Sequence, residues 1–81
     1  MVPHPLVEIW WHDAHPLTGW APLDEIPQEP RVIRSTGYLV REAIPNHYLL
    51  VQSVDVTAQT YDAGLAIPTG MVFELRYLAE L

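Results

Sequence analysis

The chain has 81 residues, which is enough for one domain and no more. It has no cysteine, so disulfide bonds and thiolate metal sites are both excluded. Ten acidic residues face four arginines and no lysine, and the net charge of −6 argues against duplex DNA or RNA as a partner, because phosphate backbones require dense cationic patches. A small phosphorylated ligand held by one or two arginines stays compatible with this charge.

Hydrophobic residues make up 49% of the chain, which is more apolar surface than so small a core can bury. Association with further copies would bury the surplus, and we therefore expect a homo-oligomer. No apolar run reaches the ~20 residues that span a bilayer, and the first residues show no basic start or cleavage pattern. These features predict a soluble, cytosolic protein without a membrane partner.

The first predicted strand covers residues 6–11 and follows an extended N-terminal arm at 1–5 that contains two prolines. Its alternation places one set on a core face: Val7, Ile9 and Trp11. The opposite set is Glu8, Trp10 and His12. An indole on the polar face requires a cover, such as a partner subunit or a ligand.

Residues 12–30 break the alternation with four prolines and a glycine, which predicts a long loop. Within this loop, residues 22–26 begin with a proline and two acids, the pattern of a short helical turn. Trp20 precedes the turn and is predicted to cover one end of the core.

The centre of the chain, residues 31–56, predicts two strands folded back on each other through a turn at 43–46. Pro45 and Asn46 suit the middle of a tight turn, because asparagine tolerates a positive φ. In the return strand, Leu49, Leu50 and Val51 are apolar in succession, which predicts burial on both faces, one of them against another subunit.

Gly37 interrupts the alternation of the first of these strands, residues 32–42. A glycine inside a strand pattern indicates a bulge or a sharp bend that resets the alternation. We expect the bend to bring Ile33, Leu39 and Phe73 into one core.

The rest of the chain predicts a polar loop at 57–64, a short strand at 65–67, a turn at 68–70 and a last strand at 71–78. The whole chain, residues 1–81, is therefore predicted to be a single mainly β domain. We expect a small five-stranded SH3-like or Sm-like barrel with one short helical turn after the first strand, because closure removes sheet edges that this apolar sequence would leave adhesive.

Four short segments occur in a characteristic order along nearly the whole chain: Trp11-His12-Asp13-Ala14, Gly19-Trp20, Ser35-Thr36-Gly37-Tyr38-Leu39-Val40, and Ile67-Pro68-Thr69-Gly70. This W-x-D-A, G-W, S-x-G-x-L-V and I-P-x-G pattern resembles a family of short, uncharacterised bacteriophage proteins. The resemblance implies a viral origin and a compact β fold. Together with the predicted cytosolic location, a viral origin leads us to expect the protein in the cytoplasm of the infected host. It carries over no catalytic residue.

Candidate ligand-binding residues are aromatic side chains that would stack on a planar group, together with arginines and hydroxyls that would hold a phosphate. The set is Trp10, Trp20, Tyr38, Arg31, Arg34, Ser35 and Thr36. The alternative is that the aromatic residues serve the core and interfaces, and that the arginines pair with the ten acids.

Catalysis and metal binding have weaker support. His12, Asp13 and His15 offer three donors within four residues, but a metal site needs further ligands that converge, such as His4 or His47. No nucleophile motif surrounds either serine, and so small a domain leaves little room for a catalytic cleft. We expect no enzyme activity, no resident metal and no cofactor.

The sequence therefore favours a phage-encoded, oligomeric binding protein that sequesters a phosphorylated nucleotide-type signal of host antiviral defence. One alternative is a protein–protein interaction module that inhibits a host protein. Another is a structural accessory protein of the virion.

Overall fold

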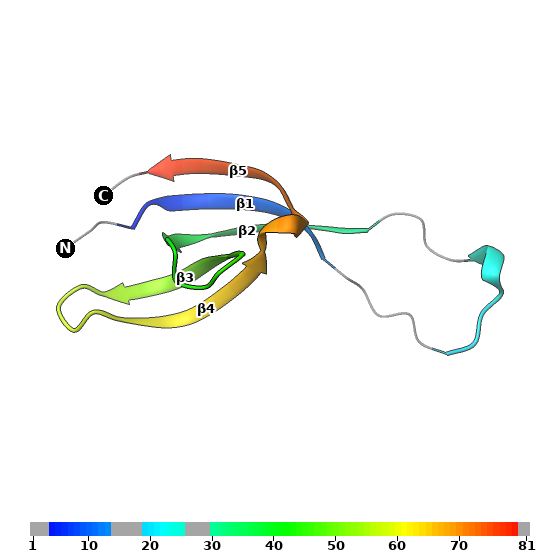
Figure 1. Cartoon of the computed structure of the whole chain (residues 1–81), viewed down its shortest axis with the longest axis horizontal. Helices are drawn as coiled ribbons and strands as arrows, with labels where there is room; N and C mark the ends of the chain where they lie inside the picture. The colour runs from blue at the N-terminus through cyan, green and yellow to red at the C-terminus, as the bar shows by residue number, and fades with distance from the viewer. Residues whose placement is uncertain (1–3, 14–18, 26–29, 80–81) are drawn as a thin grey trace.

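The computed structural model describes residues 4–13, 19–25 and 30–79. Five strands form one antiparallel sheet: β1 (Leu6–Asp13), β2 (Arg31–Val40), β3 (His47–Asp55), β4 (Thr60–Pro68) and β5 (Val72–Ala79). Their order across the sheet is β4-β3-β2-β1-β5. Two 3-10 helices, η1 (Leu23–Glu25) and η2 (Thr69–Met71), complete the described elements (Figure 1). The mainly β class and the five predicted strands are confirmed.

Most element boundaries lie within two residues of the prediction, but β4 starts at Thr60 instead of residue 65. The predicted polar loop is shorter because a tight turn closes the β3–β4 hairpin early. The Asp55 carboxylate accepts hydrogen bonds from the backbone N–H groups of Thr57 and Ala58, both at 3.0 Å. The Asp55 carbonyl accepts another from the N–H of Gln59 at 2.8 Å. These bonds return the chain directly into the ladder with β3.

The predicted closed barrel is not confirmed. In the described part of the chain, β4 pairs only with β3 and β5 pairs only with β1, so both are edges of an open sheet. Both described helices are three residues long, and neither has the length needed to cross a membrane.

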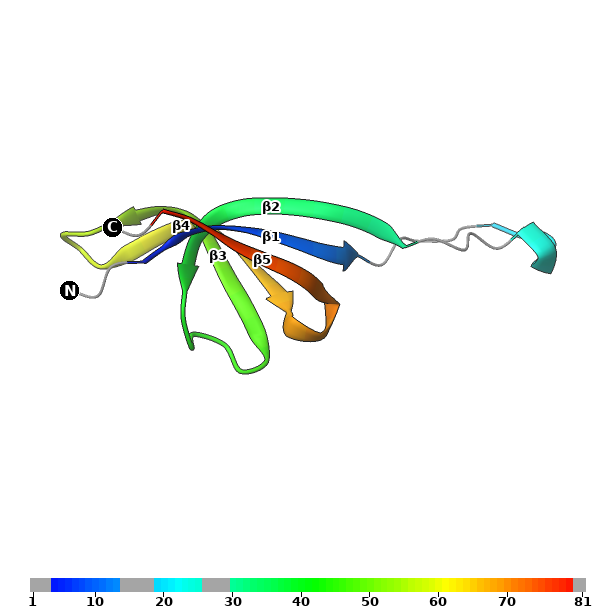
Figure 2. The same ribbon diagram turned by 90° about the horizontal axis from the view of Figure 1, so that it is seen from above.

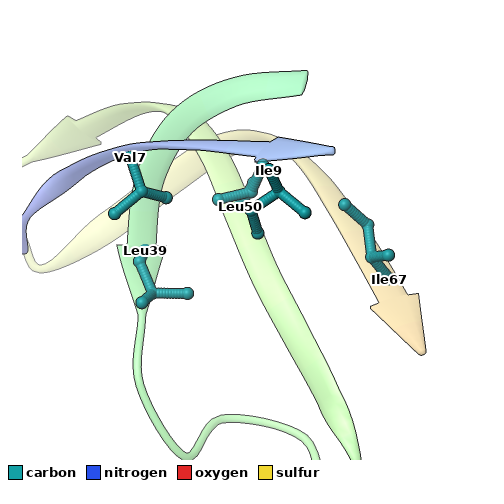
Figure 3. Close-up of a cluster of buried hydrophobic side chains, with 5 residues drawn as sticks. All are labelled: Val7, Ile9, Leu39, Leu50 and Ile67. Atoms are coloured by element: carbon teal, nitrogen blue, oxygen red, sulfur yellow. The ribbon is translucent and has the colours of Figure 1, made fainter. Parts of the chain in front are cut away.

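The core lies on one face of the curled sheet, called the inner face here. It consists of Val7 and Ile9 from β1, Leu39 from β2, Leu50 from β3 and Ile67 from β4. Figure 3 shows these side chains gathered on the side of β1 toward which β2 and β3 curl. Trp11 packs against this cluster, so the predicted core face of β1 is confirmed.

The strand β2 bends strongly along its length, as Figure 2 shows. Gly37 lies where β2 passes from pairing with β1 alone to pairing with β3, whose first partner is Tyr38. A Cβ at Gly37 would lie 3.0 Å from the Val51 carbonyl oxygen, so glycine permits the close approach of β3. The alternation is not reset, however, because inward positions run continuously from Ile33 to Leu39 and the β1–β2 register has no shift.

The expectation that Phe73 shares the core with Ile33 and Leu39 is wrong. Phe73 is 53% exposed. The β1–β5 pairing shifts register between Trp10 and Trp11, and this irregularity leaves Phe73 without a partner in β1. A residue in a bulge is turned away from the simple alternation of its strand. Its ring contacts the opposite face, where Trp10 and His12 lie.

Burial of Leu49, Leu50 and Val51 does not require another subunit. Leu50 and Val51 are 4% and 1% exposed within the single chain, and Leu49 is half-buried. The curl of the sheet therefore covers both faces of this part of β3. Of the predicted N-terminal arm, Pro5 is buried and its carbonyl accepts a hydrogen bond from the Leu39 N–H at 2.9 Å, while residues 1–3 lie outside the described ranges.

Candidate functional site

Four of the seven predicted ligand residues share the outer face of the sheet, opposite the core. Trp10 is paired with Arg34 across β1 and β2, and Thr36 and Tyr38 follow at alternate positions along β2. Alternate residues of a strand point to the same face, so the register brings these four together. The group formed by Trp10, Arg34, Thr36 and Tyr38 is called the outer patch below.

Glu8 lies on the same face as the outer patch and contacts both its tryptophan and its arginine. The Trp10 Nε1–H donates to Glu8 Oε1 at 2.7 Å, and Arg34 Nε lies 4.0 Å from Glu8 Oε2. The Arg34 guanidinium carbon is 5.5 Å from the centre of the Trp10 ring, which is a cation–π distance. Arg34 is therefore already matched by a carboxylate and an indole of its own chain.

The structure separates the remaining three predicted residues from this patch. Ser35 faces inward and accepts a hydrogen bond from the Trp11 Nε1–H at 3.0 Å. Arg31 pairs with Asp13 at the far end of the β1–β2 ladder. Trp20 is fully exposed, at 105%, so the prediction that it covers one end of the core is wrong.

The rings of Phe73 and His12, which were not predicted as ligand-binding residues, extend the outer patch toward β5. The Phe73 ring centre is 4.6 Å from that of His12 and 6.5 Å from that of Trp10. The patch is a surface of aromatic and charged groups. None of its four residues lines the described pocket, which lies elsewhere on the sheet.

This pocket, called the turn pocket here, has a volume of about 550 Å³. It is an open hollow lined by the end of β2, the β2–β3 turn at residues 41–46, the start of β3, Thr69 of η2 and Tyr77 of β5. The lining side chains that can bind a ligand are Arg41, Glu42, His47, Tyr48, Thr69 and Tyr77.

Arg41 and Tyr77, which are 36 residues apart in the sequence, meet in the turn pocket. Arg41 Nη2 donates to the Tyr77 hydroxyl at 3.2 Å, and its guanidinium carbon is 5.7 Å from the centre of the Tyr77 ring. The pocket thus presents a guanidinium beside a phenol, with Tyr48 and His47 on another wall. Such a set can hold an anion and stack on a planar group.

Backbone hydrogen bonds fix the wall of the pocket that the turn provides. The His47 N–H donates to the Ile44 carbonyl at 3.3 Å, and Asn46 adopts a φ of 61°, as predicted for this turn. Thr69 donates from its backbone N–H and its hydroxyl to the Asn46 carbonyl, at 3.0 and 3.3 Å. The turn is therefore attached to η2, and the pocket walls keep a defined spacing.

The candidate metal donors considered from the sequence are only partly described by the structure. His15 lies outside those ranges, so its position relative to His12 and Asp13 is not described. Among the described residues, no group of three or more histidine, aspartate or glutamate side chains gathers closely enough to hold a metal ion.

Comparison of the chain with protein-family models, with curated proteins and with solved structures gives no match. The resemblance to short bacteriophage proteins stays a hypothesis, and the function has to be inferred from the geometry of the two surfaces described above.

Proposed function

We propose that the chain is a small, non-catalytic binding protein that takes a planar, anionic ligand of the phosphorylated nucleotide class in the turn pocket. The observation that carries this proposal is the position of the Arg41 guanidinium in a pocket of about 550 Å³ beside Tyr77. Ligand sites are concave and combine apolar walls with polar groups, and the turn pocket is a hollow lined by side chains of both kinds.

The charge environment also favours Arg41 over the predicted Arg34. Arg34 lies within ion-pair distance of Glu8, whereas no carboxylate of the described residues lies that close to Arg41. A ligand phosphate would therefore gain a guanidinium that faces no competing carboxylate at contact distance. Glu42, also in the lining, supplies an acceptor for an exocyclic amine of a base.

The proposed setting is the cytoplasm of a bacterium infected by a phage that encodes this chain, where the protein sequesters a nucleotide signal of host defence. The motif pattern of short phage proteins supports the setting, and the absence of a nucleophile motif supports binding without catalysis.

A thermal-shift panel of cyclic and linear nucleotides tests the ligand class. A ligand present at ~100 times its dissociation constant stabilises the native state by about 2.7 kcal/mol, which is an easily measured shift. We expect one nucleotide class to stabilise the wild type and the Arg34→Gln variant, but not Arg41→Gln. A shift lost in Arg34→Gln and kept in Arg41→Gln would place the site on the outer patch instead, and no shift with any nucleotide would refute the ligand class.

A second candidate function, an interaction module for a host protein, is favoured by the exposed residues beside η1. Trp20 and Leu23 are 105% and 86% exposed, and Asp24 and Glu25 follow immediately. An apolar pair beside two acids fits an apolar groove with a basic rim on a partner protein. Loss of the same captured host protein with both Trp20→Ser and Leu23→Ser, at unchanged melting temperature, would support this candidate. Capture that is insensitive to both variants would contradict it.

We also propose that the open sheet is a variant of the small SH3-like or Sm-like barrels, and that it self-associates. The sequence of elements supports the first point: β5 follows a 3-10 turn and pairs with β1, so the first and last strands are neighbours. Among the described residues, two sheet edges have no partner strand and many apolar side chains are exposed, which supports the second point. A virion accessory protein stays an alternative role for such an assembly.

A further inference from the structure

We propose that the chain forms a two-fold symmetric dimer in which β5 pairs antiparallel with β5 of a second copy, in a register centred on Leu75. This inference rests on the self-association proposed above and specifies its interface. Within the described ranges β5 pairs with β1 on one side only, so its other edge is free for a further strand. Three of its apolar side chains are also exposed: Phe73 at 53%, Tyr77 at 51% and Leu78 at 46%.

The other edge strand, β4, is much less suited to such pairing. Ala63 has a φ of 56°, which interrupts the extended backbone in the middle of the strand, and Gly64 follows it. Pro68 ends the strand and has no N–H to donate. These are devices by which sheet edges avoid pairing with another chain. In β5 the stretch from Glu74 to Tyr77 pairs with β1 without a register shift and contains neither proline nor glycine.

Symmetry restricts the registers that a β5–β5 pair can adopt. A two-fold axis perpendicular to the sheet keeps each side chain on its own face, so only residues of the same face oppose each other. Within the regular stretch, the axis can therefore pass through Glu74, Leu75, Arg76 or Tyr77. An axis through Tyr77 places that residue opposite its own copy and places Arg76 opposite Leu78, so it forms no attractive charge pair. An axis through Glu74 places that carboxylate opposite its own copy, and an axis through Arg76 does the same with two guanidiniums.

An axis through Leu75 places Glu74 opposite Arg76 of the second copy, and by symmetry Arg76 opposite Glu74. Directly opposed residues of an antiparallel pair interact, and like charges in that position are destabilising. Among the four registers, the one centred on Leu75 alone gives two attractive pairs. The strand is thus complementary to itself in charge, as a two-fold interface requires.

The neighbouring strand extends this complementarity across the outer face. Trp10 lies beside Glu74, and Glu8 lies beside Arg76, in the β1–β5 register. In the proposed dimer, four residues on adjacent strands become neighbours across the two sheets, in the order Glu8, Arg76, Glu74 of the second copy and Trp10 of the second copy. The three charged residues of this row alternate in sign. In the single chain, Arg76 Nη2 donates to the adjacent Glu74 at 3.2 Å, and both side chains are largely exposed, at 61% and 47%. Pairing replaces this local contact with contacts between copies.

The interface is small, because register shifts on both sides confine the regular ladder to the residues from Glu74 to Tyr77. Contacts of limited area give weak, reversible association. We therefore expect a dimer that forms and dissociates in the micromolar concentration range.

Charge reversal at the two positions tests both the interface and the register. Glu74→Arg creates two like-charge contacts in the dimer, and so does Arg76→Glu, so each variant alone should dimerise roughly tenfold more weakly than the wild type. An equimolar mixture of the two variants restores both attractive pairs in a heterodimer. The double variant Glu74→Arg/Arg76→Glu restores them in a homodimer. Sedimentation velocity over a concentration series measures all four samples, and circular dichroism checks that each variant is folded.

Recovery of the dimer in the mixture and in the double variant supports the inference. Single variants that dimerise like the wild type, or a mixture no stronger than its components, overturn the β5 register while leaving self-association intact. A wild type that stays at 9.2 kDa throughout overturns both, without bearing on the ligand pocket. If a single variant does not fold, a dilution series of the wild type by NMR decides: amide shifts that change along β5 support the interface, and changes elsewhere without β5 overturn it.

Discussion

Trp10 and Trp11 are neighbours in β1, yet their side chains lie on opposite faces of the sheet and make different kinds of contact. Trp11 faces inward, packs against the core cluster and donates its Nε1–H to Ser35 on the next strand. Trp10 faces outward and donates its Nε1–H to Glu8, two residues away on the same strand, with the Arg34 guanidinium over its ring. One indole joins strands around a buried cluster, and the other takes part in a surface of charged and aromatic groups.

The contrast between the inner and the outer face shows where this small domain obtains its stability. All five residues of the buried cluster lie on the inner face, and they come from four different strands. The outer contacts are ion pairs and cation–π contacts between groups that water reaches, and such contacts contribute little each. Changes in the buried cluster should unfold the protein, whereas changes in the outer patch should alter binding or association first.

The largest expected effect is that of Ile9→Ala. Ile9 is completely buried, and an isoleucine-to-alanine change in a core costs about 3 kcal/mol through lost transfer free energy and the cavity left behind. A domain of this size has only about 3–5 kcal/mol in total, so the variant should keep at most about 2 kcal/mol and be partly unfolded at 25 °C. Urea unfolding measures the loss, and Ile9→Val, at about 1 kcal/mol, keeps it measurable.

The matched outer-face control is Thr36→Ala, an exposed position on β2. Its effect should stay within about 0.5 kcal/mol. Equal losses for Ile9→Ala and Thr36→Ala would contradict the division of the sheet into a stabilising and a functional face.

Valine substitutions at Gly37 and Gly64 compare how closely the chain is packed at two positions of the sheet. The Cβ of Gly37→Val would lie 3.0 Å from the Val51 carbonyl oxygen, which belongs to the backbone of a paired strand and has no room to move. We expect a loss of about 2 kcal/mol in the free energy of unfolding, as for other overpacked sites.

For Gly64→Val the contact at 3.0 Å is with Cε2 of the Tyr61 ring, whose residue is 62% exposed. This ring has space to rotate away, so the cost should be less than half of that at Gly37. Denaturant midpoints of the two variants provide the measurement. A larger loss at Gly64 than at Gly37 would show that β2 and β3 are not closely packed at the bend.

The sequence predicted features that depend on local alternation and turn chemistry. The faces of β1 follow from its regular alternation, and the positive φ of Asn46 follows from its place after Pro45. Phe73 was misplaced because a register shift between two strands leaves no trace in the alternation of either strand. The position of Trp20 depends on the path of a loop, which composition does not determine.

The turn pocket was missed for a similar reason. Arg41 and Tyr77 are 36 residues apart and meet only because β5 returns to pair with β1. The available signal was that Arg41 ends a predicted strand next to a turn, and such positions often serve function. The order of strands across the sheet was needed to name its partner.

A smaller effect is expected for the hydrogen bond between Trp11 and Ser35. Trp11→Phe keeps an aromatic ring but removes the N–H, and Ser35→Ala removes its acceptor. A double-mutant cycle separates this bond from the lost ring volume, and we expect a coupling free energy of about 1 kcal/mol. The same cycle for Trp10→Phe with Glu8→Ala should give less, because Trp10 and its partner lie on the outer face. A larger coupling at Trp10 would contradict the comparison.

The smallest expected effect is that of Arg34→Gln. The Arg34 side chain is 62% exposed, its Nε lies 4.0 Å from the Glu8 carboxylate, and its guanidinium carbon is 5.5 Å from the Trp10 ring. Water and salt screen both contacts, so their combined loss should reduce the free energy of unfolding by at most about 0.5 kcal/mol. Urea unfolding at low and at high ionic strength measures it, and the difference from the wild type should shrink at the higher ionic strength because the contacts are electrostatic. A salt-independent loss of several kcal/mol would mean that Arg34 holds β1 and β2 together, and the outer face would then be part of what stabilises the fold.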